Sequence, residues 1–156
     1  MITKRIKALI SKFAKHNIDG YVIPKNDEFF SEYSQNDRLK TISNFSGSAG
    51  YSIILKKKNF LFVDGRYTIQ AEKEAGNSFK IINYQKIVNC DLFKNLTLGF
   101  DPKIFTSEQI KKFFKKYNNV KIIEQNLVDQ ISKKKRISGK PFFSLENKIV
   151  GEDYKK

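Results

Sequence analysis

The chain has 156 residues, of which 40% are hydrophobic and 29% are charged, and this balance is ordinary for one globular domain with a single core. No stretch approaches the roughly 18 uninterrupted apolar residues of a membrane span, and the first residues lack a signal-peptide core. The single cysteine, Cys90, cannot form an internal disulfide and fits a reducing compartment. We therefore expect a soluble, cytoplasmic protein with no membrane partner.

The formal net charge of +14 raises nucleic acid as a possible partner. The kind of charge argues against it, because the chain has only four arginines and bidentate recognition of guanine or phosphate favours the arginine fork. The lysines fall where the solvent-facing side of a helix is expected. We predict solvated lysine faces and no specific nucleic acid partner, with a basic nucleic-acid-binding module as an alternative.

The first elements are predicted from apolar spacing. Residues 3–17 place apolar side chains at helical intervals with lysines between them, so they predict a surface helix with His16 near its end. An imidazole there is favourable against the helix dipole, which explains the histidine without a metal. Residues 21–23 are a short apolar run closed by Pro24 and predict a buried strand.

The next stretch, residues 25–48, is polar and is expected to form a long irregular loop, which in a compact domain is usually functional. Residues 51–55 and 60–63 predict an antiparallel hairpin with a lysine-rich turn. After it, the Asp64-Gly65-Arg66 turn leads into a helix over 67–75 that stops at Gly76. In that turn we expect glycine to take the difficult backbone angle, aspartate to cap the helix, and arginine to reach a carboxylate.

Further strands are expected over 79–83 and 96–100, with a helical turn around 91–93. Thr106 and Gln109 have capping-box spacing and predict a helix over about 107–117, followed by a last strand over 120–123. The order of elements predicts an α/β domain with a mixed β-sheet flanked by helices.

Residues 132–156 differ in character from the rest. They contain a basic run over 133–136 and a breaker cluster over 138–141, which predict a linker. Gly151-Glu152-Asp153 has the acidic first-turn chemistry of a new helix, with only three residues after it. We expect one domain over 1–131, then a linker and the start of a following domain that is missing, as if the chain were cut at a domain boundary.

The chemistry of a catalytic centre is not apparent. A dinuclear hydrolytic site needs converging carboxylates and usually histidine, whereas the acidic residues are dispersed and His16 is the only histidine. Residues 47–50, Gly-Ser-Ala-Gly, look like a phosphate loop but lack its lysine and lead into a strand. We therefore assign no catalytic residue and no metal ligand.

Several segments together resemble one family, the Xaa-Pro aminopeptidases (aminopeptidase P) of the creatinase and prolidase superfamily. The resemblance extends over about residues 5–131. It is carried by the Ser-Glu-Tyr and Asp-Arg-Leu motifs at 31–33 and 37–39, by the stretch 43–50 that ends in Gly-Ser-Ala-Gly, and by 62–71, 99–102 and 126–131. Asn44 stands where the family usually has glycine, and Phe62 where it has tryptophan.

This resemblance implies a creatinase-type amino-terminal domain with a ribonuclease H-like arrangement. It implies that the intact protein releases the residue before proline from a peptide, as a homodimer in which this domain narrows substrate access. Two divalent metal ions, often manganese, would lie in the missing catalytic domain and none in this part. A catalytically dead relative that acts like a histone chaperone is a further alternative.

The resemblance also assigns a role to Arg38, which matches the arginine of the family's substrate-facing loop. It implies that Arg38 is a substrate-binding residue, because a planar charged fork can hold peptide carbonyls or a carboxylate across a domain gap. A surface arginine paired with Asp37 or Glu32 is the competing interpretation. We expect Arg38 to be exposed, on the long loop, and without a buried partner.

Overall fold

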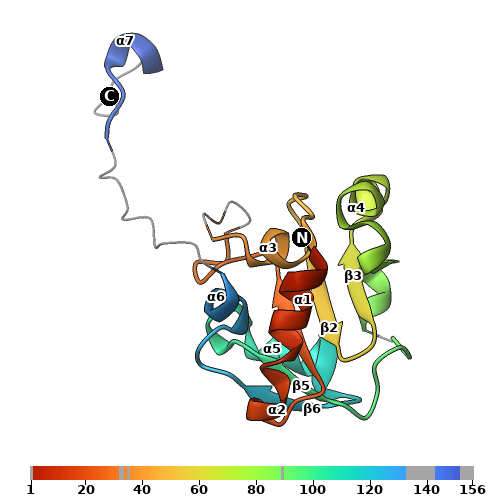
Figure 1. Ribbon diagram of the computed structural model, residues 1–156. Coiled ribbons are helices and arrows are strands. Elements are labelled where there is room, and N and C mark those ends of the chain that lie inside the picture. The colour runs from red at the N-terminus through yellow and green to blue at the C-terminus, as the bar shows by residue number, and fades with distance from the viewer. Residues whose placement is uncertain (1, 32–33, 35, 89, 133–142, 152–156) are drawn as a thin grey trace.

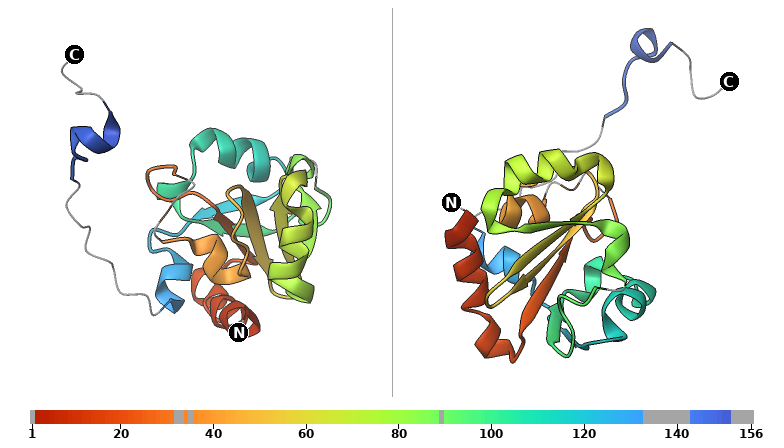
Figure 2. Two further views of the ribbon diagram at one scale, coloured as in Figure 1. Left: turned by 90° about the horizontal axis from the view of Figure 1, so that it is seen from above. Right: turned by 90° about the vertical axis from the view of Figure 1, so that its right-hand side faces the viewer.

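The computed structural model describes residues 2–31, 34, 36–88, 90–132 and 143–151. Its centre is a six-stranded sheet of order β4-β3-β2-β1-β5-β6 with helices on both faces (Figures 1 and 2). The strands are β1 (Gly20–Pro24), β2 (Gly50–Leu55), β3 (Asn59–Val63), β4 (Lys80–Asn83), β5 (Thr97–Phe100) and β6 (Asn119–Ile122). The expected mixed sheet is therefore confirmed.

Strand direction decides which loops meet. β2 runs antiparallel to both β1 and β3, whereas β1 with β5, β5 with β6, and β3 with β4 are parallel pairs. All strands except β2 consequently point the same way, and their carboxy-terminal ends share one edge of the sheet. The loops after β1 and β3 lie at that edge, together with the start of β2.

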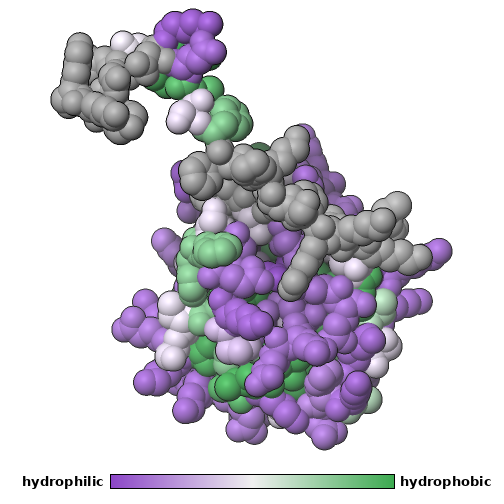
Figure 3. Space-filling model, turned by 90° about the vertical axis from the view of Figure 1, so that its left-hand side faces the viewer, coloured by the Kyte–Doolittle hydropathy of each residue, from purple (hydrophilic) through white to green (hydrophobic). Residues whose placement is uncertain are grey.

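One face of the sheet is covered by five helices. These are α1 (Ile2–Ile10), α2 (Phe13–His16), α3 (Arg38–Ser43), α4 (Thr68–Ala75) and α6 (Leu127–Ile131). Their apolar side chains form one core cluster with residues of β1, β2 and β3, and Leu9, Leu39 and Leu127 in it are fully buried. The face shown in Figure 3 is mostly hydrophilic, as expected for lysine-bearing helix surfaces.

The other face carries a second, more aromatic cluster. It is covered by the 3₁₀ turns η3 (Tyr84–Ile87) and η4 (Pro102–Ile104), by α5 (Ser107–Ile110) and by the π-helical continuation η5 (Lys111–Lys115). Phe62, Phe93 and Phe114 are buried there, and the rings of Phe62 and Phe93 meet edge to face. Two clusters on opposite faces hold the sheet between them.

Three short-range predictions are confirmed. β2 and β3 form the expected antiparallel hairpin, with Tyr51 opposite Phe62. Gly76 ends α4 with φ of 56°, and Thr106 and Gln109 form a complete capping box at α5. In the capping box each of these two side chains accepts a hydrogen bond from the other residue's backbone N–H.

Other predictions need correction. The first helix is interrupted between α1 and α2, the expected irregular loop contains α3, and residues 127–131 form α6, which was not predicted. Residues 91–93 form a turn without helix, and the 3₁₀ turn η3 precedes them. A helical turn, α7 (Asn147–Val150), lies in the predicted linker. The helix start expected at 151–153 lies mostly outside the described residues.

Candidate functional site

Three family-like segments meet at the carboxy-terminal edge of the sheet. β1 ends at Pro24, β2 begins at Gly50 and β3 ends at Val63, and these three positions are neighbours in the strand pairing. The loop after β1, the Gly-Ser-Ala-Gly loop and the Asp-Gly-Arg-Tyr turn are thus brought together from three parts of the chain. The carboxy-terminal edge is also where open α/β sheets commonly place ligands.

Arg38 forms charged hydrogen bonds with two carboxylates at this edge. Its Nε donates to Asp129 Oδ1 at 2.9 Å and its Nη2 donates to Asp129 Oδ2 at 2.7 Å, which is a bidentate fork. Nη2 also lies 2.6 Å from Glu28 Oε1. Asp129 belongs to α6, so the guanidinium joins the loop after β1 to an element 91 positions away.

The expectation that Arg38 is exposed and unpaired is wrong. It is 5% exposed and occupies the first position of α3. The competing pairing with Asp37 is wrong as well, because Asp37 caps α3 through the Lys40 backbone N–H and pairs with Lys25 at 2.5 Å. Glu32, the other partner considered, lies outside the described residues. Sequence reasoning missed the true partners because Asp129 lies on a helix that was not predicted.

Electrostatics at the fork favour the charged arginine. Burial by itself would lower the pKa of Arg38, but the hydrogen bonds to Asp129 and Glu28 outweigh this and raise the pKa. The same contact with Arg38 lowers the pKa of Glu28. The third nitrogen, Nη1, is buried and has no hydrogen-bond partner among the described residues. The fork therefore uses two of the three nitrogens.

The loop beside the fork displays two aromatic side chains. Phe29 is 89% exposed and Phe30 is 48% exposed. The loop is held by Asp27, whose Oδ1 accepts from the backbone N–H of Phe29 at 2.9 Å and of Ser31 at 3.0 Å. Phe30 has φ of 58°, a left-handed conformation that is unfavourable for a bulky residue. The chain thus maintains an unfavourable backbone conformation that leaves two apolar rings in solvent.

The glycines of the Gly-Ser-Ala-Gly loop are explained by packing. A Cβ on Gly50 would lie 2.8 Å from the carbonyl oxygen of Phe62, and one on Gly47 would lie 2.2 Å from the ring of Phe45. The loop is further tied to α4, because Ser46 donates its backbone N–H and its hydroxyl to Glu74 at 2.6 and 2.7 Å. The close approach of backbone and rings therefore explains why glycine occupies these positions, and no bound phosphate is needed to explain the motif.

The Asp-Gly-Arg-Tyr turn contacts that loop. The hydroxyls of Tyr67 and Ser48 are 2.9 Å apart, and the rings of Tyr67 and Phe45 pack edge to face. Asp64 accepts from the backbone N–H of Arg66 and pairs with its side chain at 2.9 Å, as expected. The expected difficult angle at Gly65 is wrong, because its φ is not positive. The turn is a structural junction between β3 and α4.

Metal chemistry does not fit these residues. Among the described residues, no group of three or more histidine, cysteine, aspartate or glutamate side chains is placed to hold a metal ion. Cys90 is buried, and burial raises the pKa of its thiol, which disfavours the nucleophilic thiolate.

None of the helices in the described part of the chain is both long and apolar enough to span a membrane.

Similarity to known proteins agrees with this fold. The family model of the Creatinase/Prolidase N-terminal domain matches residues 5–131. A probable Xaa-Pro aminopeptidase P from Coprinopsis cinerea is 31% identical over 98% of this chain and 27% of its own length. Xaa-Pro aminopeptidase 2 from Rattus norvegicus is 28% identical over 97% of this chain and 25% of its own length. The chain therefore spans about a quarter of these relatives.

Two solved structures extend the comparison. The X-prolyl aminopeptidase from Caenorhabditis elegans, described as a cytosolic enzyme with a di-nuclear active site, has a TM-score of 0.80 and 26% identity over 97% of this chain and 29% of its own. The N-terminal domain of the cytoplasmic peptidase PepQ from Mycobacterium tuberculosis H37Rv shares the fold, with a TM-score of 0.62 at 18% identity over 83% of this chain and 98% of its own. The chain belongs to the Creatinase/Prolidase N-terminal domain family and corresponds to the amino-terminal domain of Xaa-Pro aminopeptidase-like proteins.

Proposed function

We propose that the chain acts as the non-catalytic amino-terminal domain of an Xaa-Pro aminopeptidase and narrows substrate access to the catalytic domain. The relatives it matches are aminopeptidases about four times its length, which supports a catalytic part outside this chain. The described residues supply no group for a metal ion. Two divalent ions, often manganese in this superfamily, would therefore be held by that catalytic part.

The observation that carries the proposal is the phenylalanine loop, residues 26–31. Both of its phenylalanine rings are exposed, and hydrogen bonds to Asp27 hold the backbone of the loop. The backbone of Phe30 has an unfavourable left-handed conformation, and such conformations concentrate at functional sites. Exposed apolar side chains on a well-defined loop suit contact with a peptide or with the catalytic domain. The carboxy-terminal edge of the sheet would then form one wall of the substrate path.

Arg38 takes a changed role in this proposal. A direct substrate contact stays a prediction, and it requires the pairs with Glu28 and Asp129 to open. The closed geometry favours Arg38 as a positioning residue that fixes the phenylalanine loop against α6. Homodimer formation by the intact enzyme is proposed on the family resemblance alone.

The test uses the full reading frame that contains this chain. Replacing both rings, Phe29→Ala with Phe30→Ala, should lower kcat/KM for Xaa-Pro peptides about tenfold through lost positioning, with an unchanged Tm. The matched control is Leu92→Ala, a partly exposed apolar side chain near the opposite edge of the sheet. This variant should keep the wild-type kinetics.

Two outcomes would contradict the proposal itself, and a third would contradict a specific role for the loop. One is a reading frame without the series of two aspartates, a histidine and two glutamates that binds the metal ions, which would favour a catalytically dead, chaperone-like relative. The other is kcat/KM unchanged in the double variant. Equal losses in the double variant and in Leu92→Ala would also count against a specific role for the loop.

A further inference from the structure

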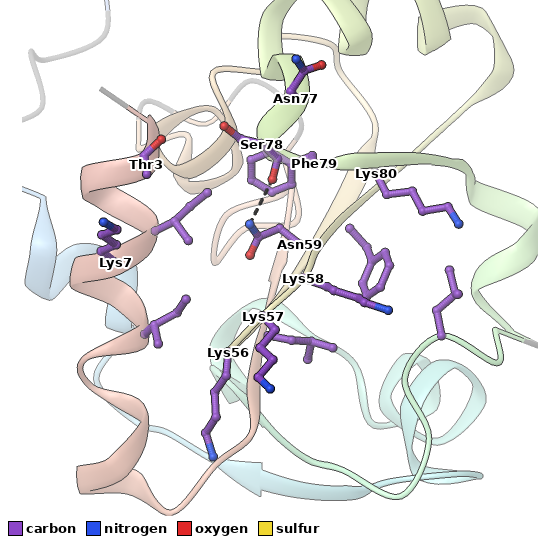
Figure 4. A pocket seen from close by; sticks show the side chains of 15 residues that line it. Thr3, Lys7, Lys56, Lys57, Lys58, Asn59, Asn77, Ser78, Phe79 and Lys80 are labelled. Atoms are coloured by element: carbon purple, nitrogen blue, oxygen red, sulfur yellow. Dashed lines mark hydrogen bonds between the residues drawn. The ribbon is translucent and has the colours of Figure 1, made fainter.

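A second candidate site lies away from the phenylalanine loop, where β3 and β4 begin. A cavity of about 720 Å³ is lined there by α1, by the β2–β3 turn, by the residues leading into β4 and by Leu92. Figure 4 shows these elements and the labelled side chains. The volume lies in the range of about 300 to 1,000 Å³ that is usual for small-molecule sites.

The charge of this cavity is of one sign. Five lysines line it, Lys7, Lys56, Lys57, Lys58 and Lys80, and no aspartate or glutamate lines it among the residues that the structure describes. Of these, only Lys56 forms an ion pair with a described residue, the exposed Asp19 at 3.1 Å. The lysines come from a helix, a turn and a strand that are far apart in the sequence, so tertiary structure concentrates the charge. Such a concentration of one sign attracts and retains anions.

The arrangement of the ammonium groups limits which kinds of ligand can contact several of them at once. In Figure 4, Lys56, Lys57 and Lys58 fan out around the turn, Lys80 extends on the same side as Lys58, and Lys7 stands on the facing helix. The groups do not converge on one point. A ligand with several separated negative charges therefore satisfies them better than a single phosphate.

One buried polar atom in the wall of the cavity has no hydrogen-bond partner among the described residues. Asn59 donates its side-chain N–H to the carbonyl of Ser78 at 3.0 Å, the dashed line in Figure 4. Its Oδ1 is buried and accepts no hydrogen bond from a described residue. A buried acceptor without a donor is costly, and a ligand that turns the Asn59 amide toward the opening and offers it a hydroxyl or amino hydrogen would remove that cost. Ile6 and Phe79 supply apolar wall around it.

We propose that this cavity binds a small ligand with two or more phosphate groups and a hydroxyl or amino donor. Nucleoside diphosphates and triphosphates share this chemistry with bisphosphorylated sugars. The phosphates would lie among the lysines, and the donor would meet Asn59 Oδ1 after the amide has turned toward the opening. The site is separate from the proposed wall of the peptide path and does not depend on peptidase activity.

Calorimetric titration of the 156-residue chain at about 150 mM salt tests the proposal, because non-specific attraction is weak at that ionic strength. ADP, fructose 1,6-bisphosphate and tripolyphosphate serve as separate ligands. We expect saturable 1:1 binding of ADP or of the bisphosphate at least fivefold tighter than of tripolyphosphate, which lacks the donor. The tighter of the first two ligands identifies the source of the phosphates.

Matched charge reversals locate the site. Lys57→Glu with Lys58→Glu should weaken binding at least tenfold, and Lys80→Glu on another element should weaken it independently. Lys111→Glu with Lys112→Glu makes the same net-charge change at exposed positions outside the cavity and should have less than a twofold effect. Circular dichroism verifies that each variant is folded.

Three results would overturn the proposal: no saturable binding of any of the three ligands, equal loss in both double variants, or an unaltered affinity in Lys57→Glu with Lys58→Glu. Tripolyphosphate binding as tightly as the other ligands would refute the role of Asn59.

Discussion

Arg38 connects the loop after β1 to α6 by charged hydrogen bonds, so its removal should weaken the fold. Breaking a fully buried pair costs about 3 to 5 kcal/mol. Glu28 and Asp129 are 40% and 39% exposed, and water can solvate them once the arginine is gone. We therefore predict that Arg38→Ala lowers the free energy of unfolding by about 1 to 3 kcal/mol, measured by urea denaturation.

The control for Arg38 is Arg66→Ala. Arg66 also pairs with a carboxylate, Asp64 at 2.9 Å, but its side chain is 78% exposed. Water solvates both groups in either state, so we expect no measurable loss of stability. If the two variants lost stability equally, the burial of Arg38 would not explain its effect.

Glu28 predicts an acid-dependent part of the stability. The hydrogen bond from Arg38 lowers the pKa of Glu28 from its ordinary value of 4.5 in the folded state. Its contribution is therefore fully present above pH 4.5 and is lost as the pH falls through the lower, folded-state pKa. We expect Glu28→Gln to be less stable than wild type near neutral pH, and the gap to close in acid.

Urea midpoints measured from about pH 7 to about pH 3 test this expectation. Glu72→Gln, at an exposed position of α4, is the matched control and should run parallel to wild type. A gap between Glu28→Gln and wild type that stays constant down to the lowest pH would contradict a charge-linked contribution.

At the scale of elements, the end of α3 explains a departure from the family pattern. Asn44 stands where the family usually has glycine, and it follows α3 with φ of 66°. Asparagine tolerates this left-handed conformation better than other non-glycine residues. Its Oδ1 also accepts a hydrogen bond from Arg5 of α1 at 2.6 Å. Asparagine therefore replaces glycine without preventing the turn.

This geometry gives a paired prediction. Asn44→Ala and Asn44→Gly both remove the contact with Arg5, but only alanine is strained at this φ. We expect the alanine variant to be about 1 kcal/mol less stable than the glycine variant in thermal or urea unfolding. Equal stability of the two variants would mean that the turn relaxes and that φ does not limit the residue choice.

For the whole molecule, the net charge of +14 predicts only non-specific attraction to nucleic acid. Binding by lysine contacts with phosphate releases counterions and weakens steeply with salt. We expect any affinity for duplex DNA, measured by fluorescence anisotropy, to fall at least tenfold between about 50 and 150 mM salt and to be equal for unrelated sequences. Sequence-selective binding that persists at the higher salt would favour the nucleic-acid-binding alternative.

The sequence by itself determined the features whose energies are local. The β2–β3 hairpin, the Thr106 capping box and the stop at Gly76 each depend on residues within a few positions of one another. Local patterns of this kind report backbone preferences and orphan hydrogen-bonding groups directly. The order of the predicted elements likewise indicated the mixed sheet, and the family motifs indicated the family.

Only the tertiary structure decided which distant side chains meet. Arg38 is buried because strand order carries α6 and Asp129 to the loop after β1, and α6 was not predicted because its five residues are too few for a clear helical period. The lysine cavity depends in the same way on α1 facing the β2–β3 turn. Ion pairing and cavity formation depend on distances in space, which residue spacing along the chain does not determine.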